Sequence, residues 1–193
     1  DDDLLDAIVK GYARVIDAKS PFTYGHSERV AHYTGLLTEE LGLGATTQLW
    51  MWRTAMLHDI GKLGVSNRIL DKNGKLTDEE FENIKRHPVM TESILSPVRP
   101  FHPMAWIAAT HHERLDGRGY PYGLSGDALT REMRILTVAD IFDALSADRP
   151  YRAALPLEKV RTIMGDMVGT AVDGDVLDAL WSVILKYEGS MSH

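Results

Sequence analysis

Histidine and aspartate residues of the kind that bind metal ions recur along this chain. His58 and Asp59 directly follow the apolar segment Trp50–Leu57. Folding would therefore bury a charged carboxylate that needs a compensating cation. Histidines and aspartates at the ends of several helices are typical of a metal site in the core of a helical bundle. The candidate ligands are His26, His58, Asp59, His87, His111, His112 and Asp140.

Several of these residues also have an ordinary structural interpretation when taken alone. His26 could be a surface residue or a cap near a helix start, and His87, which precedes Pro88, could interact with a helix dipole. The pair His111–His112 is a weak signal by itself. Only the combination of all of them favours a metal site.

The number of candidate ligands indicates two metal ions. Five histidines and two aspartates exceed the roughly four to six ligands of a single ion. If Asp59 bridges, then His26, His58 and Asp140 complete one site, and the remaining three histidines complete the other. Two ions about 3.5–4 Å apart, with a hydroxide between them, stabilise the attacking and leaving oxygens of a phosphoryl displacement. Imidazole and carboxylate ligands suit iron, manganese, nickel or zinc.

Basic residues gather near the same segments, and two of them, Arg149 and Arg152, are predicted to bind phosphate. Lys62 follows the His-Asp-Ile-Gly turn and should stay within reach of the metal ions. Arg149 and Arg152 come after the segment that carries Asp140, and arginine can bind a phosphate through two parallel hydrogen bonds.

Composition restricts the remaining possibilities. The 193 residues are 44% hydrophobic and contain no cysteine, so the chain has no disulfide and no thiolate ligand. The net charge of −7 argues against binding to long nucleic acid. No apolar run reaches the roughly 18 residues of a membrane span, so we expect a cytoplasmic protein without direct membrane contact. Because the chain begins at Asp1 and not at Met, we expect a longer protein with an upstream sensor domain.

The apolar residues recur at helical spacing almost throughout, and no segment alternates with the period of a strand. We predict an all-α bundle of about seven to nine helices, with residues 1–22 as an N-terminal helix or connector and 23–193 as the metal-binding domain. Thr77 and Glu80 form a capping box at one helix start. The predicted helices span about 4–16, 25–41, 46–61, 77–87, 89–95, 103–113, 131–147, 157–167 and 175–188.

Five motifs in this order resemble the HD-GYP family. They are His58-Asp59-Ile60-Gly61-Lys62, His111-His112-Glu113, Asp116-Gly117-Arg118-Gly119-Tyr120-Pro121, Asp140-Ile141-Phe142-Asp143-Ala144-Leu145 and Arg149-Pro150-Tyr151-Arg152. The resemblance implies an HD-domain fold and hydrolysis of the bacterial second messenger cyclic di-GMP to pGpG, with GMP as the product of a second cut. It implies a non-haem metal centre, usually of iron and sometimes of manganese.

The family's residue roles transfer to this chain by position. Its metal ligands correspond to the seven candidates above, with Asp59 as the bridge, and its phosphate contacts correspond to Lys62, Arg149 and Arg152. Gly119, Tyr120 and Pro121 shape the site in the family and, in some members, contact partner proteins. Glu113 and Asp143 have no ligand role in this pattern. Asp143 could orient a ligand or form a structural salt bridge.

The sequence departs from the family in two places. Members with three metal ions have Glu four residues before the first ligand histidine, where this chain has Phe22. We therefore predict two ions, and the final product stays open between pGpG and GMP. Residues 172–175 read Val-Asp-Gly-Asp where the family has Phe-Asp-Pro, which predicts a changed helix start.

Three alternatives to a cyclic di-GMP phosphodiesterase remain. The substrate could be another cyclic dinucleotide such as 3′,3′-cGAMP, because no motif reads the base. The chain could be a non-hydrolytic receptor that signals to partners, although a receptor has little need of two metal ions. Related HD-domain folds also support di-iron oxygenases, which the Gly-Tyr-Pro loop and the phosphate-binding arginines disfavour.

Overall fold

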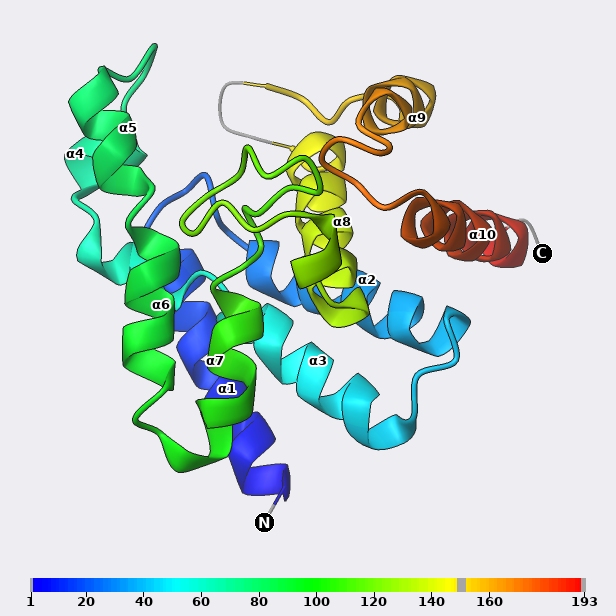
Figure 1. Ribbon diagram of the computed structural model, residues 1–193, viewed down its shortest axis with the longest axis horizontal. Coiled ribbons are helices and arrows are strands. Elements are labelled where there is room, and N and C mark those ends of the chain that lie inside the picture. The colour runs from blue at the N-terminus through cyan, green and yellow to red at the C-terminus, as the bar shows by residue number, and fades with distance from the viewer. Residues whose placement is uncertain (1, 149–151, 192–193) are drawn as a thin grey trace.

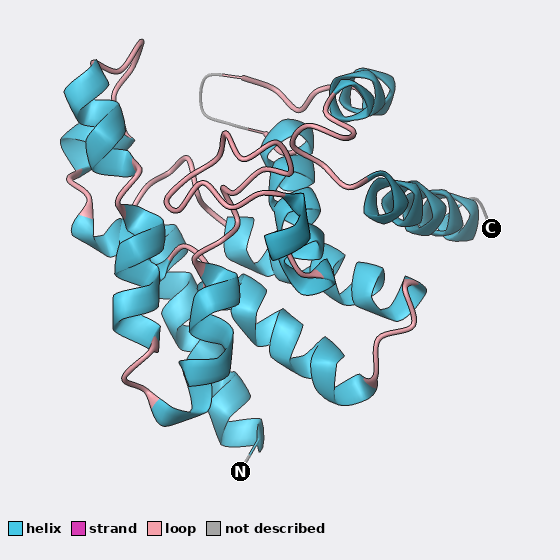
Figure 2. Ribbon diagram, in the orientation of Figure 1, coloured by secondary structure: helices cyan, strands magenta, loops and turns pink. Residues whose placement is uncertain are grey.

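A computed structural model describes residues 2–148 and 152–191. It confirms the all-α fold that the helical spacing of the apolar residues predicts. No strand occurs in the described residues, only two isolated β-bridges (Figure 2). The α-helices are α1 (Asp2–Ala18), α2 (His26–Glu40), α3 (Ala45–Leu57), α4 (Asn67–Leu70), α5 (Asp78–Ile84), α6 (His87–Leu95), α7 (His102–Ala108), α8 (Arg131–Ser146), α9 (Leu157–Asp166) and α10 (Gly174–Met191). Three short 3-10 helices join them, namely η1 (Ile60–Gly64), η2 (Arg99–Phe101) and η3 (Gly126–Ala128).

The core lies where α2 packs against α3 and α8 (Figure 1). Helix α1 contributes Val9, Ala13 and Ile16 to this core and contacts α2 and α3. The N-terminal helix is thus packed on the rest of the structure, and the domain boundary at residue 22 stays a prediction. None of the described helices is both long and apolar enough to cross a membrane.

Polar side chains define several helix starts. The Thr77 capping box is confirmed, since the Thr77 hydroxyl accepts from Glu80 N and the Glu80 carboxylate accepts from Thr77 N. At the changed motif of residues 172–175, Asp173 Oδ1 accepts from the backbone N–H groups of Asp175 and Val176 at 2.9 and 3.1 Å. Helix α10 therefore begins at Gly174 with Asp173 as its cap.

Two predicted helix ends are wrong. The predicted helix 103–113 ends at Ala108, and the one expected to reach residue 61 ends at Leu57, where η1 follows. In both places a histidine ring bonds a carbonyl near the helix end, as His111 Nδ1 does with Ala108 O at 2.6 Å. The described residues contain the nine predicted helices and one further single turn, α4, in the connection 60–76.

Close packing of η1 on α6 fixes the segment that follows His58 and Asp59. The backbone N–H of Gly61 donates to Thr91 Oγ1 at 2.9 Å, and that hydroxyl donates to His58 O at 3.1 Å. A Cβ atom at Gly61 would collide with the carbonyl oxygen of His87 and with Thr91. Only glycine allows the two segments to approach this closely.

We predict that Gly61→Ala lowers the free energy of unfolding by about 1–3 kcal/mol, because η1 must move away from α6. The matched control is Gly35→Ala within α2, where an added Cβ meets no atom within 4 Å. The control should raise the free energy of unfolding by up to about 1 kcal/mol. Chemical denaturation of both variants measures this. Equal stability of the two variants would contradict the packing argument.

Candidate metal centre

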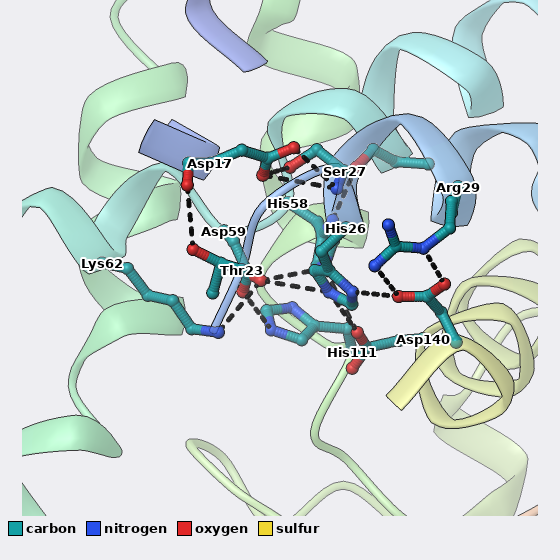
Figure 3. Close-up of polar contacts among 12 residues, drawn as sticks. Asp17, Thr23, His26, Ser27, Arg29, His58, Asp59, Lys62, His111 and Asp140 are labelled. Carbon is teal, nitrogen blue, oxygen red and sulfur yellow. Dashed lines mark hydrogen bonds and ion pairs between the residues drawn. The ribbon is translucent and has the colours of Figure 1, made fainter. Parts of the chain in front are cut away.

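The Asp59 carboxylate lies among the rings of His26, His58 and His111 (Figure 3). Its two oxygens face different groups of histidines. Oδ2 is 3.4 Å from His26 Nε2 and 3.3 Å from His58 Nε2. Oδ1 is 3.4 Å from His87 Nε2 and 3.3 Å from His111 Nε2. A carboxylate in this position can bridge two metal ions.

The seven candidate ligands, Asp59 among them, fall into two groups. Within each group, the possible ligand atoms lie within 4.8 Å of one another. Asp140 Oδ1 belongs to the first group, at 2.9 Å from His26 Nε2 and 3.4 Å from His58 Nε2. The groups are His26, His58, Asp59 and Asp140 on one side and His87, His111 and His112 on the other. The structure therefore brings the residues together in the division that the ligand count predicts.

Five segments of the chain supply these side chains. His26 is the first residue of α2, His58 follows α3, and His87 is the first residue of α6. Asp140 lies in the middle of α8. His111 and His112 lie in the turn after α7. The site is thus assembled from helix ends and one helix face that are far apart in sequence.

Hydrogen bonds to the backbone set the orientation of three histidine rings. His58 Nδ1 lies 2.5 Å from Ala55 O, His87 Nδ1 lies 2.7 Å from Ile84 O, and His111 Nδ1 lies 2.6 Å from Ala108 O. A carbonyl accepts only, so each Nδ1 carries the proton. In the neutral form of each ring, Nε2 then presents a lone pair toward the other candidate ligands, which is the arrangement of metal-binding histidines.

The donor set fits metal ions. Among the described residues, the buried His58 Nε2 and Asp59 Oδ1 have no hydrogen-bond partner. His87 Nε2 and His111 Nε2 lie 3.1 Å apart, and in the tautomers just described both are acceptors. Lone pairs that face each other in a buried site need a cation between them. Imidazole nitrogens and carboxylate oxygens are suitable ligands for divalent iron, manganese, nickel or zinc.

In the first group, the histidines and aspartates stabilise each other's charged forms. Burial alone lowers the pKa of His26, but hydrogen bonds to aspartates, Asp140 foremost, outweigh it and hold that pKa well above the usual value. Burial also opposes protonation of His58, yet the charges of Asp59 and Asp140 raise its pKa to about 9. Burial would raise the pKa of both aspartates, but the facing cations hold both pKa values well below the usual range. Without metal ions, protons therefore balance the carboxylates here.

In the second group, the pKa values of two histidines are lowered instead of raised. Burial lowers the pKa of His111, and burial together with the proximity of His111 lowers the pKa of His112 well below its usual value. These two rings are neutral at pH 7, the form in which imidazole binds a metal ion.

Asp143 forms both of the contacts that the sequence left open. Its Oδ2 is 2.7 Å from His26 Nδ1, and its Oδ1 accepts from Arg29 Nε at 2.6 Å. Arg29 Nη2 adds a longer bond of 3.2 Å to Oδ2. Asp143 thus fixes the ring of His26 while Arg29 neutralises the carboxylate.

The predicted phosphate contacts differ in their surroundings. Lys62 Nζ lies 3.1 Å from Asp59 Oδ2, and its side chain is 21% exposed. Arg152 donates to the carbonyl oxygens of Ala144 and Leu145, at 2.8 and 3.3 Å, near the end of α8. Arg149 lies outside the described residues. The roles of all three toward phosphate stay predictions.

The Gly-rich loop that contains Gly119, Tyr120 and Pro121 passes beside the second group of histidines. The Tyr120 ring stacks on the His112 ring, with centroids 4.8 Å apart and planes at 22°. A Cβ atom at Gly119 would collide with the backbone of residues 112–114, so glycine is required for the loop to pass this close. This loop therefore forms part of the wall of the site.

Sequence reasoning missed the roles of Glu113 and Arg29. The buried Glu113 carboxylate accepts from Tyr122 N at 2.6 Å and from Leu124 N at 2.9 Å, and so fastens the Gly-rich loop. A charged residue directly after a pair of candidate metal ligands, His111 and His112, is a signal for Glu113. For Arg29, the sequence contains no signal that pairs it with Asp143, 114 residues away.

Comparison with known proteins gives a match over most of the chain. Residues 11–176 match the family described as HD domain. The chain is 51% identical over 180 residues to the 3′3′-cGAMP-specific phosphodiesterase 3 of Vibrio cholerae, covering 93% of this chain and 39% of the relative. It is 40% identical over 170 residues to the cyclic di-GMP phosphodiesterase response regulator RpfG of Xanthomonas campestris, covering 87% of this chain and 45% of the relative. The chain thus spans less than half the length of these relatives.

Solved structures agree with this match. A crystal structure of V. cholerae V-cGAP3, described as a cyclic GMP-AMP specific phosphodiesterase, is 44% identical with a TM-score of 0.61, covering 95% of this chain and 42% of that one. The HD domain of Listeria monocytogenes PgpH in complex with cyclic-di-AMP has a TM-score of 0.64 at 16% identity, covering 95% of this chain and 97% of that one. The second likeness shows the fold alone.

We predict that Asp143→Asn weakens metal binding about 10–100-fold, because the His26 ring loses the carboxylate that orients it. Titration of metal-free protein with Mn(II) measures this. The control is Asp127→Asn, which changes an exposed carboxylate on η3. Identical Mn(II) affinity of the two variants would contradict a positioning role for Asp143.

We also predict that metal binding at pH 7 releases about two protons per chain, because His26 and His58 are protonated before binding and must become neutral ligands. Calorimetry in two buffers of different ionisation enthalpy measures the number. It should fall as the pH rises past about 9, where His58 has already lost its proton. A pH-independent number would show that these histidines do not exchange protons for metal.

Proposed function

This chain belongs to the HD-domain family, and we propose that it is a metal-dependent phosphodiesterase that hydrolyses cyclic dinucleotides. The observation that carries the proposal is the Asp59 carboxylate, which faces His26 and His58 through one oxygen and His87 and His111 through the other. Relatives named as phosphodiesterases of 3′3′-cGAMP and of cyclic di-GMP support the substrate class.

Two metal ions would be held by the two groups of ligands, with Asp59 shared between them. Iron is the first candidate and manganese the second, and nickel or zinc would suit the same donors in purified protein. When bound, such a pair polarises a phosphate oxygen and lowers the pKa of water so that hydroxide is available near neutral pH. Phe22 occupies the position where three-metal members have a glutamate, which supports two ions.

The residues of the chain supply orientation and charge. Asp143 and the backbone carbonyls of Ala55, Ile84 and Ala108 hold the histidine rings. Lys62, a partly exposed cation beside Asp59, receives a phosphate oxygen as substrate enters and neutralises its charge. We propose that Arg149 and Arg152 form further phosphate contacts. To do so, Arg152 must break its hydrogen bonds to the carbonyl oxygens of Ala144 and Leu145 at the end of α8.

The proposed substrates are 3′,3′-cGAMP and cyclic di-GMP. Relatives at 51% and 42% identity are named as specific for 3′3′-cGAMP, and relatives at 41% and 40% are named for cyclic di-GMP. We therefore rank 3′,3′-cGAMP first. Opening of one phosphodiester bond gives a linear dinucleotide, which is pGpG for cyclic di-GMP. Partner proteins would dock on the loop that contains Gly119, Tyr120 and Pro121.

Chromatography of both cyclic dinucleotides tests this proposal, with protein loaded anaerobically with Fe(II) and, separately, with Mn(II). We expect metal-dependent conversion to linear products and a loss of more than about 100-fold for His58→Ala. The control is His32→Ala, which alters a histidine of α2 that contacts Tyr33 and Tyr187 instead of the metal centre. Conversion by His58→Ala at the rate of the control would contradict the proposal. Binding of cyclic dinucleotide without conversion, with two ions bound, would instead identify a receptor.

A further inference from the structure

A row of rings leads from the metal centre to the exposed surface of α5. Tyr120 stacks on His112, and the Phe81 ring lies edge-on to Tyr120 with centroids 6.3 Å apart and planes at 80°. Lys85 Nζ lies 5.3 Å from the Phe81 centroid and 5.9 Å from the Tyr120 centroid. An aromatic face and a cation thus lie together, one ring beyond the Tyr120 ring that covers His112.

Phe81 is held in place although its ring is not part of the core. Phe81 is 45% exposed. The Thr77–Glu80 capping box and the ion pair of Lys72 Nζ with Glu80 Oε2, at 2.6 Å, fix the helix that carries it. Burial explains the aromatic residue only in part, and a partly exposed ring on a well-held helix is suited to stacking with a planar ligand.

We propose that Phe81 and Lys85 form the subsite for a guanine base of the substrate, an inference that rests on the proposed function. The base would stack on Phe81, as bases do on aromatic side chains in single-strand recognition. Guanine presents two acceptors, O6 and N7, on one edge, and adenine has an amino donor in place of O6. A lysine ammonium only donates hydrogen bonds, so Lys85 favours guanine over adenine.

Lys85 is available for such a contact. Its Nζ pairs with Glu82 Oε1 at 2.5 Å, but the Glu82 side chain is 65% exposed and the Lys85 side chain is 27% exposed. Ion pairs in contact with water contribute little to stability. Lys85 can therefore exchange Glu82 for a base while its ammonium group stays beside the two rings. Both proposed substrates contain guanine, which agrees with this preference.

Steady-state kinetics with metal-loaded protein tests the subsite. We expect Phe81→Ala to raise the KM for 3′,3′-cGAMP and cyclic di-GMP about 10–100-fold, with a smaller change in kcat and with unchanged metal content. Phe81→Tyr should restore the KM. Lys85→Met should reduce the preference for the guanine substrates over cyclic di-AMP, measured as a substrate or as an inhibitor. The controls are Tyr12→Ala, an exposed aromatic on α1, and Lys159→Met, an exposed lysine on α9.

The outcomes separate this inference from the proposed function. If the wild-type protein cleaves cyclic dinucleotides and Phe81→Ala has the KM of the Tyr12→Ala control, the guanine subsite is wrong and the phosphodiesterase stands. If Phe81→Ala loses metal ions, or Phe81→Tyr fails to restore the KM, the ring has a structural role and the subsite is again wrong. If the wild-type protein cleaves methyl p-nitrophenyl phosphate but no cyclic dinucleotide, the proposed function itself fails.

Discussion

A carboxylate that is removed from water has to be matched by positive charge, and the Asp59 carboxylate is almost fully buried. Four histidine nitrogens lie 3.3–3.4 Å from its two oxygens. Protons on His26 and His58 compensate one oxygen in the ion-free protein, whereas Oδ1, which faces His87 and His111, has no hydrogen-bond donor among the described residues. This imbalance makes the cluster a place for cations, and the surrounding helices are arranged around it.

Helix ends hold the rings at this carboxylate. His58, His87 and His111 each bond, through Nδ1, the carbonyl of the residue three positions earlier, namely Ala55, Ile84 and Ala108. Carbonyls in the last turn of a helix lack a hydrogen-bond donor within the helix. Each histidine Nδ1–H supplies that donor, and the same bond orients the histidine ring. The same bond to the carbonyl three residues earlier thus orients three candidate ligands. Gly61 lets η1, which follows His58, pack closely on α6, which begins at His87.

The sequence permits prediction of the candidate ligands but not of the contacts that hold them. His-Asp motifs beside apolar helices, and the excess of ligands over the needs of one ion, predict two groups around Asp59, and the structure brings the residues together in that division. The helix through Glu113 is wrong because helical spacing does not reveal that His111 bonds Ala108. The pairing of Arg29 with Asp143 depends on how α2 packs on α8, so it could not be predicted. The placement of Phe81 beside Tyr120 depends likewise on the path of the Gly-rich loop.

The central claim is that Asp59 bridges two metal ions, one in each group of ligands. Anomalous diffraction from crystals of manganese-loaded protein, measured on both sides of the metal absorption edge, tests it most directly. We expect two anomalous peaks, roughly 3.5–4 Å apart, one among His26, His58 and Asp140 and the other among His87, His111 and His112, with an Asp59 oxygen on each. A single peak, or two peaks that do not share Asp59, would contradict it.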